Sequence, residues 1–534
     1  MIFRSPYPDV TVPPVGLPEF LLGGLTADDA GRVAIVDAVT GETLRYGELA
    51  DGVARIAGAL AARSVGRGDV AGLFAPNCAA YPLAFHGILA SGAAASPINA
   101  LYTPAELAHQ LRDSGARVLF SPPGGVERAR VAVAEPGVRI TEIVVLGDPV
   151  PGRGPVPETG VADLLAAHEP VPYAAVDGED LAALPYSSGT TGLPKGVQLT
   201  HRNLVANLLQ MQPLVRTSPG SRLLTAVPLF HIYGLTGIMN GALHRRAGVV
   251  TLPRFDLAQF LGAIAEHRVD HVFIAPPVAL ALAHHPLVDA YDMSSVEIVM
   301  SAAAPLDAAL ARRVETRLGA TVVQGYGLTE SSPCTHGIPV ERTDLDRGSI
   351  GLPMPNVEAR VVDPGTGEDA APGERGELWC RGPNIMRGYL NNPDATAAAV
   401  DEEGWLHTGD LVTVDADGAF HVVDRLKELI KYKGYQVAPA ELESVLLRHD
   451  GVADAAVIGV RDGDGQEIPK AFVVRSATCP ELDADAVMGF VAAQVAPYKK
   501  VRAVEFVDAI PKSAAGKILR KELRARAAGP VVTA

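Results

Sequence analysis

The chain has 534 residues, of which 48% are hydrophobic, 20% charged and 5% aromatic. This apolar content can bury large cores, which excludes a disordered chain and a small disulfide-stapled scaffold. The formal net charge is −15, and an acidic surface repels phosphate backbones, so we expect no nucleic-acid partner. The four cysteines lie far apart without paired spacing, which indicates neither a zinc site nor a disulfide framework.

Two stretches without charged residues, 70–104 and 223–243, are long enough to span a bilayer, which takes about 20 residues. Prolines, asparagines and histidines interrupt both stretches, and this favours buried strands, short helices and loops over lipid-facing helices. The N-terminal sequence MIFRSPYPDV lacks the apolar core of a signal peptide. We therefore expect a soluble, cytoplasmic protein that does not bind membranes.

Hydrophobic periodicity predicts a helix over residues 46–60. Apolar runs predict strands at 70–74, 117–120, 142–146, 271–275, 296–300 and 321–323. Helical patterns separate several of these runs, which indicates a layered α/β architecture. The composition changes near residue 425, and residues 499–526 hold nine Lys or Arg against three Asp or Glu. We place a domain boundary at Lys427, with one domain over 1–426 and a small α+β domain over 427–534.

The most informative segment runs from Tyr186 to Val197 and reads YSSGTTGLPKGV. Its glycines allow close backbone approach to a ligand, its hydroxyls can donate hydrogen bonds, and Lys195 supplies a cation, so the segment suits a polyphosphate. A Walker A loop does not fit, because Gly196 rather than Ser or Thr follows the lysine. A flexible surface loop is the ordinary alternative for such a composition.

This segment resembles the phosphate-binding signature of the adenylate-forming enzymes, which include acyl-CoA synthetases, beetle luciferases and peptide-synthetase adenylation domains. Further signatures of the family follow in its order and span nearly the whole chain. They are PLFHIY (228–233), QGYGLTE (324–330), GWLHTGD (404–410), DRLKELIK (424–431), YKGYQVAPAE (432–441) and PKSAAGK (511–517). Within the family, the chain is most similar to the 4-coumarate–CoA ligases.

The resemblance implies a large N-terminal domain of layered α/β subdomains and a small, mobile C-terminal α+β domain with its hinge at Lys427. It implies a ligase that activates a carboxylic acid with ATP to acyl-AMP and then transfers the acyl group to CoA, with Mg²⁺ as cofactor. The residues that it implies for ATP or AMP are Ser187, Ser188, Gly189, Thr190, Thr191, Gly192, Lys195, Gln324, Gly325, Tyr326, Thr329, Glu330, Asp410 and Arg425.

For three of these positions, the side-chain chemistry alone also indicates a role. Glu330 closes a Gly-Tyr-Gly turn, where a carboxylate can hold Mg²⁺; a solvated glutamate at a strand end is the alternative. Tyr326 offers a ring for stacking on adenine. Asp410 can accept hydrogen bonds from both ribose hydroxyls, and an Asx-turn cap is the alternative. The resemblance assigns the ribose jointly to Asp410 and Arg425.

The catalytic residues that the resemblance implies are Lys517, His231, Lys431 and Gln436. Lys517 matches the lysine that meets the charge of the phosphoryl oxygens during adenylation, where fixed cations carry much of the catalysis. Lys431 and Gln436 match residues that orient the adenylate in the second step, and Lys433 and Gly434 lie near CoA in the family.

Two further roles rest on the resemblance. His231 matches a residue that contacts the carboxylate end of the acyl site, whereas a packed histidine is the alternative from the residues alone. Lys517 also resembles a lysine that is acetylated in related synthetases, so a lysine acetyltransferase and a deacetylase are expected partners.

The acyl substrate is predicted from the pocket positions that match the family. They are Tyr233, Gly237, Ala302, Ala303, Gly325, Gly327, Pro333 and Cys334. Apart from the Tyr233 hydroxyl they are small or apolar, which suits a flat aromatic ring, and the segment after His231 has no acid to pair an amino acid's ammonium. Cinnamate or 4-coumarate is the first choice. A medium-chain fatty acid and a pseudoenzyme that binds ATP without turnover are the alternatives.

Two positions depart from the plant 4-coumarate–CoA ligases. Ala302 stands where they usually have Gly, and Cys334 stands where they often have Val. An added methyl group can narrow the ring slot, and such a change is worth about 1–3 kcal/mol of discrimination between substrates.

Overall fold

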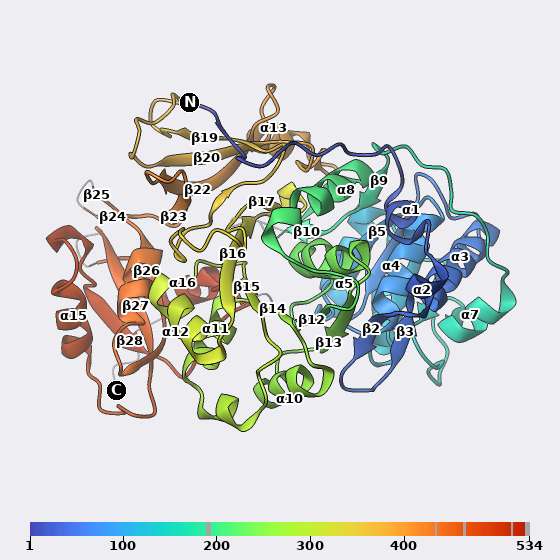
Figure 1. Cartoon of the computed structure of the whole chain (residues 1–534), viewed down its shortest axis with the longest axis horizontal. Coiled ribbons are helices and arrows are strands. Elements are labelled where there is room, and N and C mark those ends of the chain that lie inside the picture. The colour runs from blue at the N-terminus through green and yellow to red at the C-terminus, as the bar shows by residue number, and fades with distance from the viewer. Residues whose placement is uncertain (188–193, 433–434, 463–465, 514–515, 529–534) are drawn as a thin grey trace. The chain divides into compact units, whose positions relative to one another are not determined.

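The computed structural model describes residues 1–187, 194–432, 435–462, 466–513 and 516–528. These residues form two compact units, each drawn in Figure 1. The larger unit comprises Phe3–Glu358 and Cys380–Leu406, and the smaller unit comprises Met1–Ile2, Ala359–Trp379 and His407–Ala534. Both units combine sheets with helices, so the predicted α/β class, with a large N-terminal domain and a smaller C-terminal one, is confirmed.

The first sheet of the larger unit is mostly parallel and follows the order β10-β11-β9-β5-β4-β6-β7-β8. Its central strands are short apolar runs that are buried on both faces, as parallel strands covered by helices are. The strands are β4 (Val70–Phe74), β5 (Ala94–Ile98), β6 (Val118–Ser121), β7 (Glu142–Val145), β8 (Glu158–Gly160), β9 (Leu181–Ala183), β10 (Tyr186–Ser187) and β11 (Lys195–Thr200). A two-residue strand, β21 (Gly388–Tyr389), pairs with β11.

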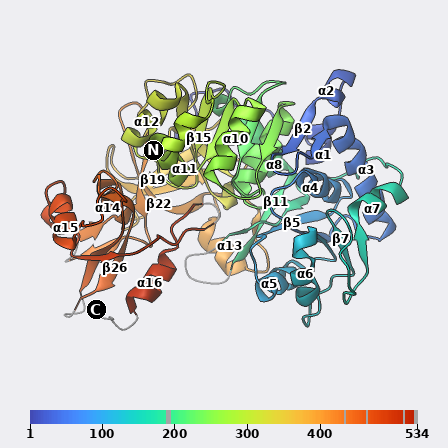
Figure 2. The same cartoon turned by 90° about the horizontal axis from the view of Figure 1, so that it is seen from below.

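Helices cover this sheet on both faces, with α5 and α6 on one and α3 and α4 on the other (Figure 2). They are α3 (Tyr46–Ala62), α4 (Ala80–Ala90), α5 (Pro104–Ser114) and α6 (Val126–Val133), and α7 (Val161–Ala167) packs against α3. The sequence fixes the ends of α5 locally. Thr103 and Glu106 form a capping box at its start, and Gly115 ends it with a φ of 66°.

The second sheet follows the order β18-β17-β16-β15-β14-β12-β13-β2-β3, with a parallel centre from β16 to β2. Apolar residues of α10, α11 and α12 form one buried core with its strands. The strands are β2 (Val33–Asp37), β3 (Thr43–Arg45), β12 (Arg222–Thr225), β13 (Gly248–Thr251), β14 (His271–Ile274), β15 (Ile298–Ser301), β16 (Thr321–Gly327), β17 (Cys334–Gly337) and β18 (Leu352–Pro353).

The remaining elements of the larger unit are mostly helical. The α-helices are α1 (Leu17–Leu22), α2 (Ala27–Gly31), α8 (His201–Gln210), α9 (Gly241–His244), α10 (Leu257–His267), α11 (Pro276–His284), α12 (Ala308–Leu318) and α13 (Pro393–Ala399). A π-helix, η3 (Tyr233–Asn240), leads directly into α9. Short 3₁₀ turns are η1 (Pro123–Gly125), η2 (Gln212–Leu214), η4 (Pro286–Ala290) and η5 (Thr329–Ser331), and β1 (Phe3–Arg4) is a two-residue strand.

The smaller unit contains an antiparallel meander and a sheet between helices. The meander pairs β22 with β23, and the sheet has the order β26-β27-β28. Successive residues of β26 face opposite sides: Ala455 and Val457 pack with α14 and α15, while Ala456 and Ile458 pack with α16. The elements are β19 (Glu358–Val362), β20 (Gly376–Arg381), β22 (Leu406–Val414), β23 (Phe420–Arg425), β24 (Ile430–Tyr432), β25 (Tyr435–Val437), α14 (Pro439–Leu446), β26 (Val452–Arg461), β27 (Glu467–Arg475), α15 (Ala484–Ala492), η6 (Pro497–Lys499), β28 (Ala503–Phe506) and α16 (Arg520–Ala528).

The predicted elements are present with small shifts of their ends. The expected helix over 46–60 is α3, and the expected strands are β4, β6, β7, β14, β15 and β16. The two stretches without charge fold as β4, α4 and β5 and as β12, η3 and α9. Across the part of the chain that the structure describes, no helix is both long and apolar enough to cross a membrane.

The larger unit contains several buried histidines, one of which joins two helices. His201 begins α8, and its Nδ1 accepts a hydrogen bond of 3.0 Å from the backbone N–H of Leu17 in α1. Burial lowers the pKa of His201 to about 4, and burial likewise lowers the pKa of His86 and of His336 to about 3. Such groups are neutral in the folded protein near pH 7.

The low histidine pKa values make stability depend on pH. An unfolded histidine has a pKa of about 6.5, so between about 6.5 and about 4 the unfolded chain binds a proton at position 201 that the folded chain does not. Stability therefore falls as the pH falls through this interval, by about 1–2 kcal/mol at pH 5 for this one residue. We expect His201→Asn, whose side-chain oxygen can accept the same bond without titrating, to lose less stability between pH 7.5 and 5.

Calorimetric unfolding at the two pH values measures this difference. His267→Asn is the matched control, because His267 is only half-buried, in the last turn of α10. If His201→Asn and the unaltered protein lost the same free energy of unfolding between pH 7.5 and 5, the low pKa of His201 would be contradicted.

Candidate active site

The carboxyl ends of β14, β15 and β16 lie side by side, because the three strands are parallel neighbours. Along β16 the buried residues 322–324 give way to half-exposed residues from Gly325 to Glu330. Ala302 and Ala303 follow β15 directly and are also half-exposed. Open α/β sheets bind ligands at this edge, so the structure gathers predicted acyl-pocket residues at a typical ligand-binding position.

The backbone at this edge is close-packed. A Cβ atom on Gly327 would lie 1.8 Å from the carbonyl oxygen of Pro333, so no side chain fits there. Ala303 has a φ of 74°, in the left-handed region that costs a residue with a side chain about 1–2 kcal/mol. Cys334 pairs with Gly327 across β16 and β17, and burial raises the pKa of its thiol to about 12. The thiol is therefore a neutral, inert wall group.

The π-helix η3 sets Tyr233 against the same strand ends. The Tyr233 hydroxyl donates to the carbonyl oxygens of Met300 at 3.2 Å and Ile274 at 3.4 Å. Burial raises its pKa well above the usual value for tyrosine. Because this hydroxyl is hydrogen-bonded to the sheet, Tyr233 offers its ring rather than a polar group to the predicted acyl pocket. A Cβ atom on Gly237, one turn later, would lie 3.2 Å from that ring.

His231 lies just before η3 and is half-buried. Its Nδ1 accepts a hydrogen bond of 3.4 Å from the backbone N–H of Tyr233. The loop that carries it is fixed by Asn77, whose side chain accepts from the N–H of Leu229 at 2.7 Å and donates to the carbonyl of Val227 at 3.0 Å. Asn77 is buried, and no sequence pattern indicated this role.

Glu330 lies in η5 after β16, beside Thr329, and its carboxylate is fixed by two hydroxyl groups. Its Oε1 accepts hydrogen bonds from Ser187 at 2.9 Å and from Tyr389 at 2.8 Å. Burial, and then the charge of Glu330, raise the pKa of Tyr389 well above its usual value, so the phenol stays a donor. Two predicted nucleotide residues, Ser187 and Glu330, are thus in direct contact, and Tyr389, which the sequence did not indicate, is a second donor to the same carboxylate oxygen.

Strand pairing explains this convergence. Ser187 pairs with Lys195 across β10 and β11, and Tyr389 pairs with Val197 across β11 and β21. The Lys195 ammonium lies 4.2 Å from the centre of the Tyr389 ring, a cation–π contact. The Lys195 cation and the Glu330 carboxylate therefore both contact one tyrosine, Tyr389.

Two other predicted nucleotide residues have identifiable neighbours. The Gln324 side chain is buried, accepts from the N–H of Leu306 at 3.0 Å and donates to the Leu306 carbonyl at 3.1 Å, so it braces the loop after β15. The Tyr326 ring lies edge-on to the His336 ring at 6.0 Å. Ser188, Gly189, Thr190, Thr191, Gly192, Lys433 and Gly434 lie outside the described residues, as does the side chain of Gln436.

Buried amide side chains, two on α8 and one at Asn384 in the loop after β20, hold the segments next to Glu330. Asn207 donates to the Cys334 carbonyl at 2.7 Å and accepts from the Cys334 N–H at 3.1 Å. Asn384 donates to the carbonyls of Ser331 at 2.9 Å and Cys334 at 3.1 Å. Asn203 donates to the carbonyls of Pro383 and Ile385 at 2.8 and 2.9 Å. Polar residues four apart on α8 were the available sequence signal, but their partners lie more than a hundred residues away.

In the smaller unit, Asp410 and Arg425, which are predicted to share the ribose, form an ion pair. They face each other across β22 and β23, and the guanidinium Nε lies 2.9 Å from the buried Asp410 carboxylate. Gly409, with a φ of 72°, turns the chain just before Asp410, and its N–H donates to Glu377 at 2.9 Å.

The predicted second-step residues lie on a short hairpin of the smaller unit. Lys431 and Gln436 are directly opposed across β24 and β25. The side chain of Lys431 is exposed, and its backbone N–H donates to Glu467 at 2.8 Å. Lys427 lies in an exposed turn between β23 and β24.

Lys517 lies in a turn before α16, where its carbonyl accepts from Ser513 N–H at 2.8 Å. Many of the basic residues around it are paired with acids of the same unit. The pairs are Lys499 with Glu441, Lys512 with Asp454, Arg520 with Glu443, Arg524 with Glu428 and Arg526 with Glu505. The excess of positive charge counted in the sequence is therefore largely compensated locally.

The sequence models of two protein-family domains match the chain. They are "AMP-binding enzyme", over residues 26–390, and "AMP-binding enzyme C-terminal domain", over residues 441–517. The chain belongs to the AMP-binding enzyme family. The chain is 42% identical to 4-coumarate–CoA ligase-like 9 of Oryza sativa subsp. japonica, over 98% of this chain and 95% of that one. It is 40% identical to 4-coumarate–CoA ligase 2 of the same plant, over 99% and 95% of the two chains.

Solved structures agree with this assignment. An anthranilate CoA ligase in complex with anthranoyl-AMP has a TM-score of 0.87 and 28% identity, over 97% of this chain and 98% of that one. A benzoate CoA ligase from Burkholderia xenovorans LB400 has a TM-score of 0.86 and 28% identity, over 95% and 99%. The protein is an AMP-forming CoA ligase of the 4-coumarate–CoA ligase-like type, which uses ATP to adenylate an acid.

The contact between Tyr389 and Glu330 yields a test of the site. Tyr389→Phe keeps the ring beneath Lys195 but removes one donor to the carboxylate. A hydrogen bond to a charged group is worth about 1.5–3 kcal/mol, so we expect acid-dependent ATP–pyrophosphate exchange to fall roughly 10- to 100-fold.

Tyr7→Phe is the matched control, because the Tyr7 hydroxyl donates to Glu341 at 2.6 Å in the same unit, in a different Tyr–Glu pair. Equal exchange rates for Tyr389→Phe and the control would contradict a role of Tyr389 at the nucleotide.

Proposed function

We propose that the ligase activates an aryl acid of the cinnamate or 4-coumarate type and transfers it to CoA. The observation that carries this proposal is the small size of the residues at the ends of β15 and β16. Next to the Tyr233 ring, these positions have only small, uncharged side chains or none, and they are Ala302, Ala303, Gly325 and Gly327. The names of the relatives, 4-coumarate–CoA ligases, and of the structural neighbours, anthranilate and benzoate CoA ligases, support an aromatic acid.

The first step joins the acid to AMP. A carboxylate oxygen of the acid attacks the α-phosphorus of ATP, an O–P bond forms, and the bond to the bridging oxygen breaks to release pyrophosphate. Ser187, Lys195 and Glu330 are proposed to hold the phosphates, and Asp410 and Arg425 the ribose. His231, fixed next to Tyr233, is proposed to position the reacting carboxylate.

Glu330 is the proposed magnesium ligand. Its Oε1 is fixed by two hydroxyl donors, which orients the carboxylate without neutralising it. In the described residues, no group of three or more His, Cys, Asp or Glu side chains could hold a metal by themselves. A single carboxylate fits Mg²⁺, because this ion keeps several waters and is bound by one or two carboxylates together with substrate phosphates. When bound, Mg²⁺ would neutralise phosphate charge.

The second step transfers the acyl group. The sulfur of CoA attacks the acyl carbon, and AMP leaves as the thiol proton is lost to solvent. Lys431 and Gln436 are proposed to orient the adenylate, with Lys433 and Gly434 next to CoA. Rotation of the C-terminal domain about Lys427 is proposed to exchange Lys517 for this hairpin between the steps. A hinge there has to release Asp424, which accepts from the Ala440 N–H at 3.0 Å.

A separation of the two half-reactions tests the role of Lys517. Lys517→Ala removes the cation that is proposed to meet charge on the phosphoryl oxygens, so we expect adenylation to fall at least 100-fold while thioester formation from supplied acyl-AMP is retained. Lys521→Ala, an exposed lysine in the same basic segment, is the control. Equal losses in both half-reactions would contradict this role. Acetylation of Lys517 by an acetyltransferase, reversed by a deacetylase, is proposed to have the same selective effect.

An acid panel tests the substrate proposal directly. AMP release with ATP, Mg²⁺ and CoA is compared for cinnamate, 4-coumarate, benzoate and octanoate, and we expect the highest kcat/KM for the cinnamate type. A higher kcat/KM for octanoate would contradict the proposal. A medium-chain fatty acid is the second candidate, because an apolar-walled pocket adjoins Gly237. A cytoplasmic location stays a prediction.

A further inference from the structure

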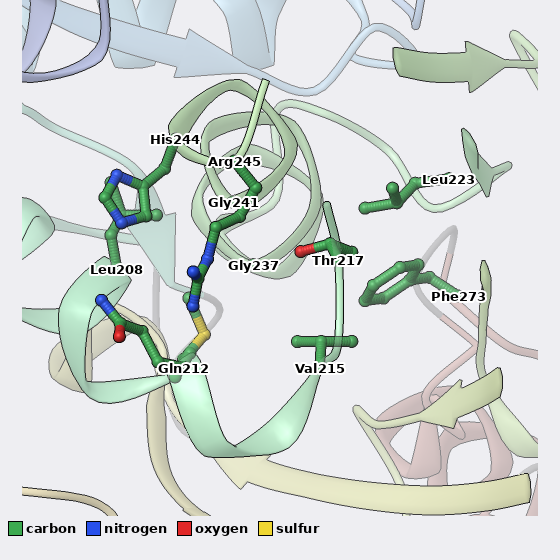
Figure 3. A pocket seen from close by; sticks show the side chains of 11 residues that line it. Leu208, Gln212, Val215, Thr217, Leu223, Gly237, Gly241, His244, Arg245 and Phe273 are labelled. Carbon is green, nitrogen blue, oxygen red and sulfur yellow. The ribbon is translucent and has the colours of Figure 1, made fainter. Parts of the chain in front are cut away.

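A pocket lies beyond the predicted acyl slot, within the larger unit (Figure 3). Its walls are mostly apolar and come from Leu208, Met211, Val215, Leu223 and Phe273. Gly237 of η3 is both a lining residue of this pocket and a member of the predicted acyl slot. The pocket therefore adjoins the predicted slot at Gly237, and the centre of its Phe273 ring lies 6.4 Å from that of the Tyr233 ring.

The pocket contains one cation and no acid among its described lining residues. Arg245 follows α9, and Figure 3 shows its side chain extended across the pocket toward Gln212. Its guanidinium is half-buried, and burial lowers the pKa of the group, which at neutral pH stays charged. Within the described part of the chain, no acceptor is found for the Arg245 side chain.

The neighbouring polar groups do not compensate this charge. His244 lines the same pocket, and burial with the adjacent Arg245 and Arg246 lowers its pKa to about 4, so it is neutral at pH 7. Arg246, by contrast, is used by the fold, since it donates to the carbonyls of Leu21 and Leu243. A partly desolvated cation without a protein partner is stabilised by an anionic ligand and not by an alkyl chain.

We propose that Arg245 is a specificity-determining residue that binds a second anionic group on the acid, at the end remote from the activated carboxyl. The inference rests on the proposed function, because it takes the slot at Ala302 and Gly325 to hold the acyl group. Among the proposed aryl acids, it favours those that extend past Tyr233 and end in a carboxylate or a comparable anion over those that end in an uncharged group. The apolar walls hold the intervening hydrocarbon, and Arg245 holds its charged end.

Matched pairs of acids test this proposal in the full-length ligase. 4-Carboxycinnamate is compared with 4-methylcinnamate, and suberate with octanoate, in AMP release and in calorimetric binding of the corresponding acyl-sulfamoyl adenosines. We expect the carboxylated member of at least one pair to bind roughly 10- to 100-fold more tightly. Arg245→Met is expected to remove this preference and to leave binding of the methyl-ended or alkyl member unchanged.

Arg216→Met is the control, because Arg216 is exposed and is not part of the pocket lining. Rejection of both carboxylated acids by the unaltered ligase, with the other acids accepted, would overturn the role of Arg245 and leave the proposed function intact. If no acid of either pair released AMP or bound as its adenylate analogue, the proposed function itself would fail. The comparison within each pair needs no variant, so it holds even if Arg245→Met does not fold.

Discussion

The structure of the candidate site depends on one carboxylate, that of Glu330, which two hydroxyl groups hold from different strands. Ser187 comes from β10 and Tyr389 from β21, and both strands pair with β11. A carboxylate fixed in this way is oriented before any ligand arrives, so little rearrangement opposes binding. Lys195 on β11 lies over the same tyrosine, which sets positive and negative charge at a fixed spacing for a polyphosphate and its metal ion.

The loop that carries Glu330 is held by hydrogen bonds from buried amide side chains. Asn207 and Asn384 both bind the carbonyl of Cys334, and Asn384 also binds that of Ser331. Buried amides that are fully hydrogen-bonded specify one loop conformation, because a shift would leave polar groups unsatisfied. The same loop contributes Cys334 to the edge where the acyl group is proposed to lie, so the proposed nucleotide and acyl positions share one support.

Local sequence patterns predicted the helices and strands well. The helix at 46–60 and the strand at 70–74 follow from hydrophobic spacing, which is a property of neighbouring residues. The motif residues Ser187 and Glu330 were both expected at the nucleotide, and their side chains are hydrogen-bonded although 143 residues separate them. The pairing of Asp410 with Arg425 was likewise expected from the motifs, and the antiparallel register of β22 and β23 supplies it.

Contacts between distant segments could not be predicted from one sequence. Tyr389 reaches Glu330 only because β21 pairs with β11, a register that no local pattern encodes. The charge of residues 499–526 suggested a field around Lys517, but acids on α14 and β26 compensate much of it. Arg245 belongs to no motif of the sequence, and its interest as a binding residue comes only from its position in the pocket.

The most direct test of the central claim is calorimetric binding of Mg·ATP and of AMP to Glu330→Gln, with Glu341→Gln as the control at the other Tyr–Glu pair. Glutamine can still accept a hydrogen bond from Tyr389 but has no charge for Mg²⁺. We expect Mg·ATP binding to weaken at least 10-fold, in line with the loss of a charged ligand, while AMP binding stays unchanged. Equal affinities of Glu330→Gln and the unaltered ligase for Mg·ATP would show that the fixed carboxylate does not hold the metal and phosphates.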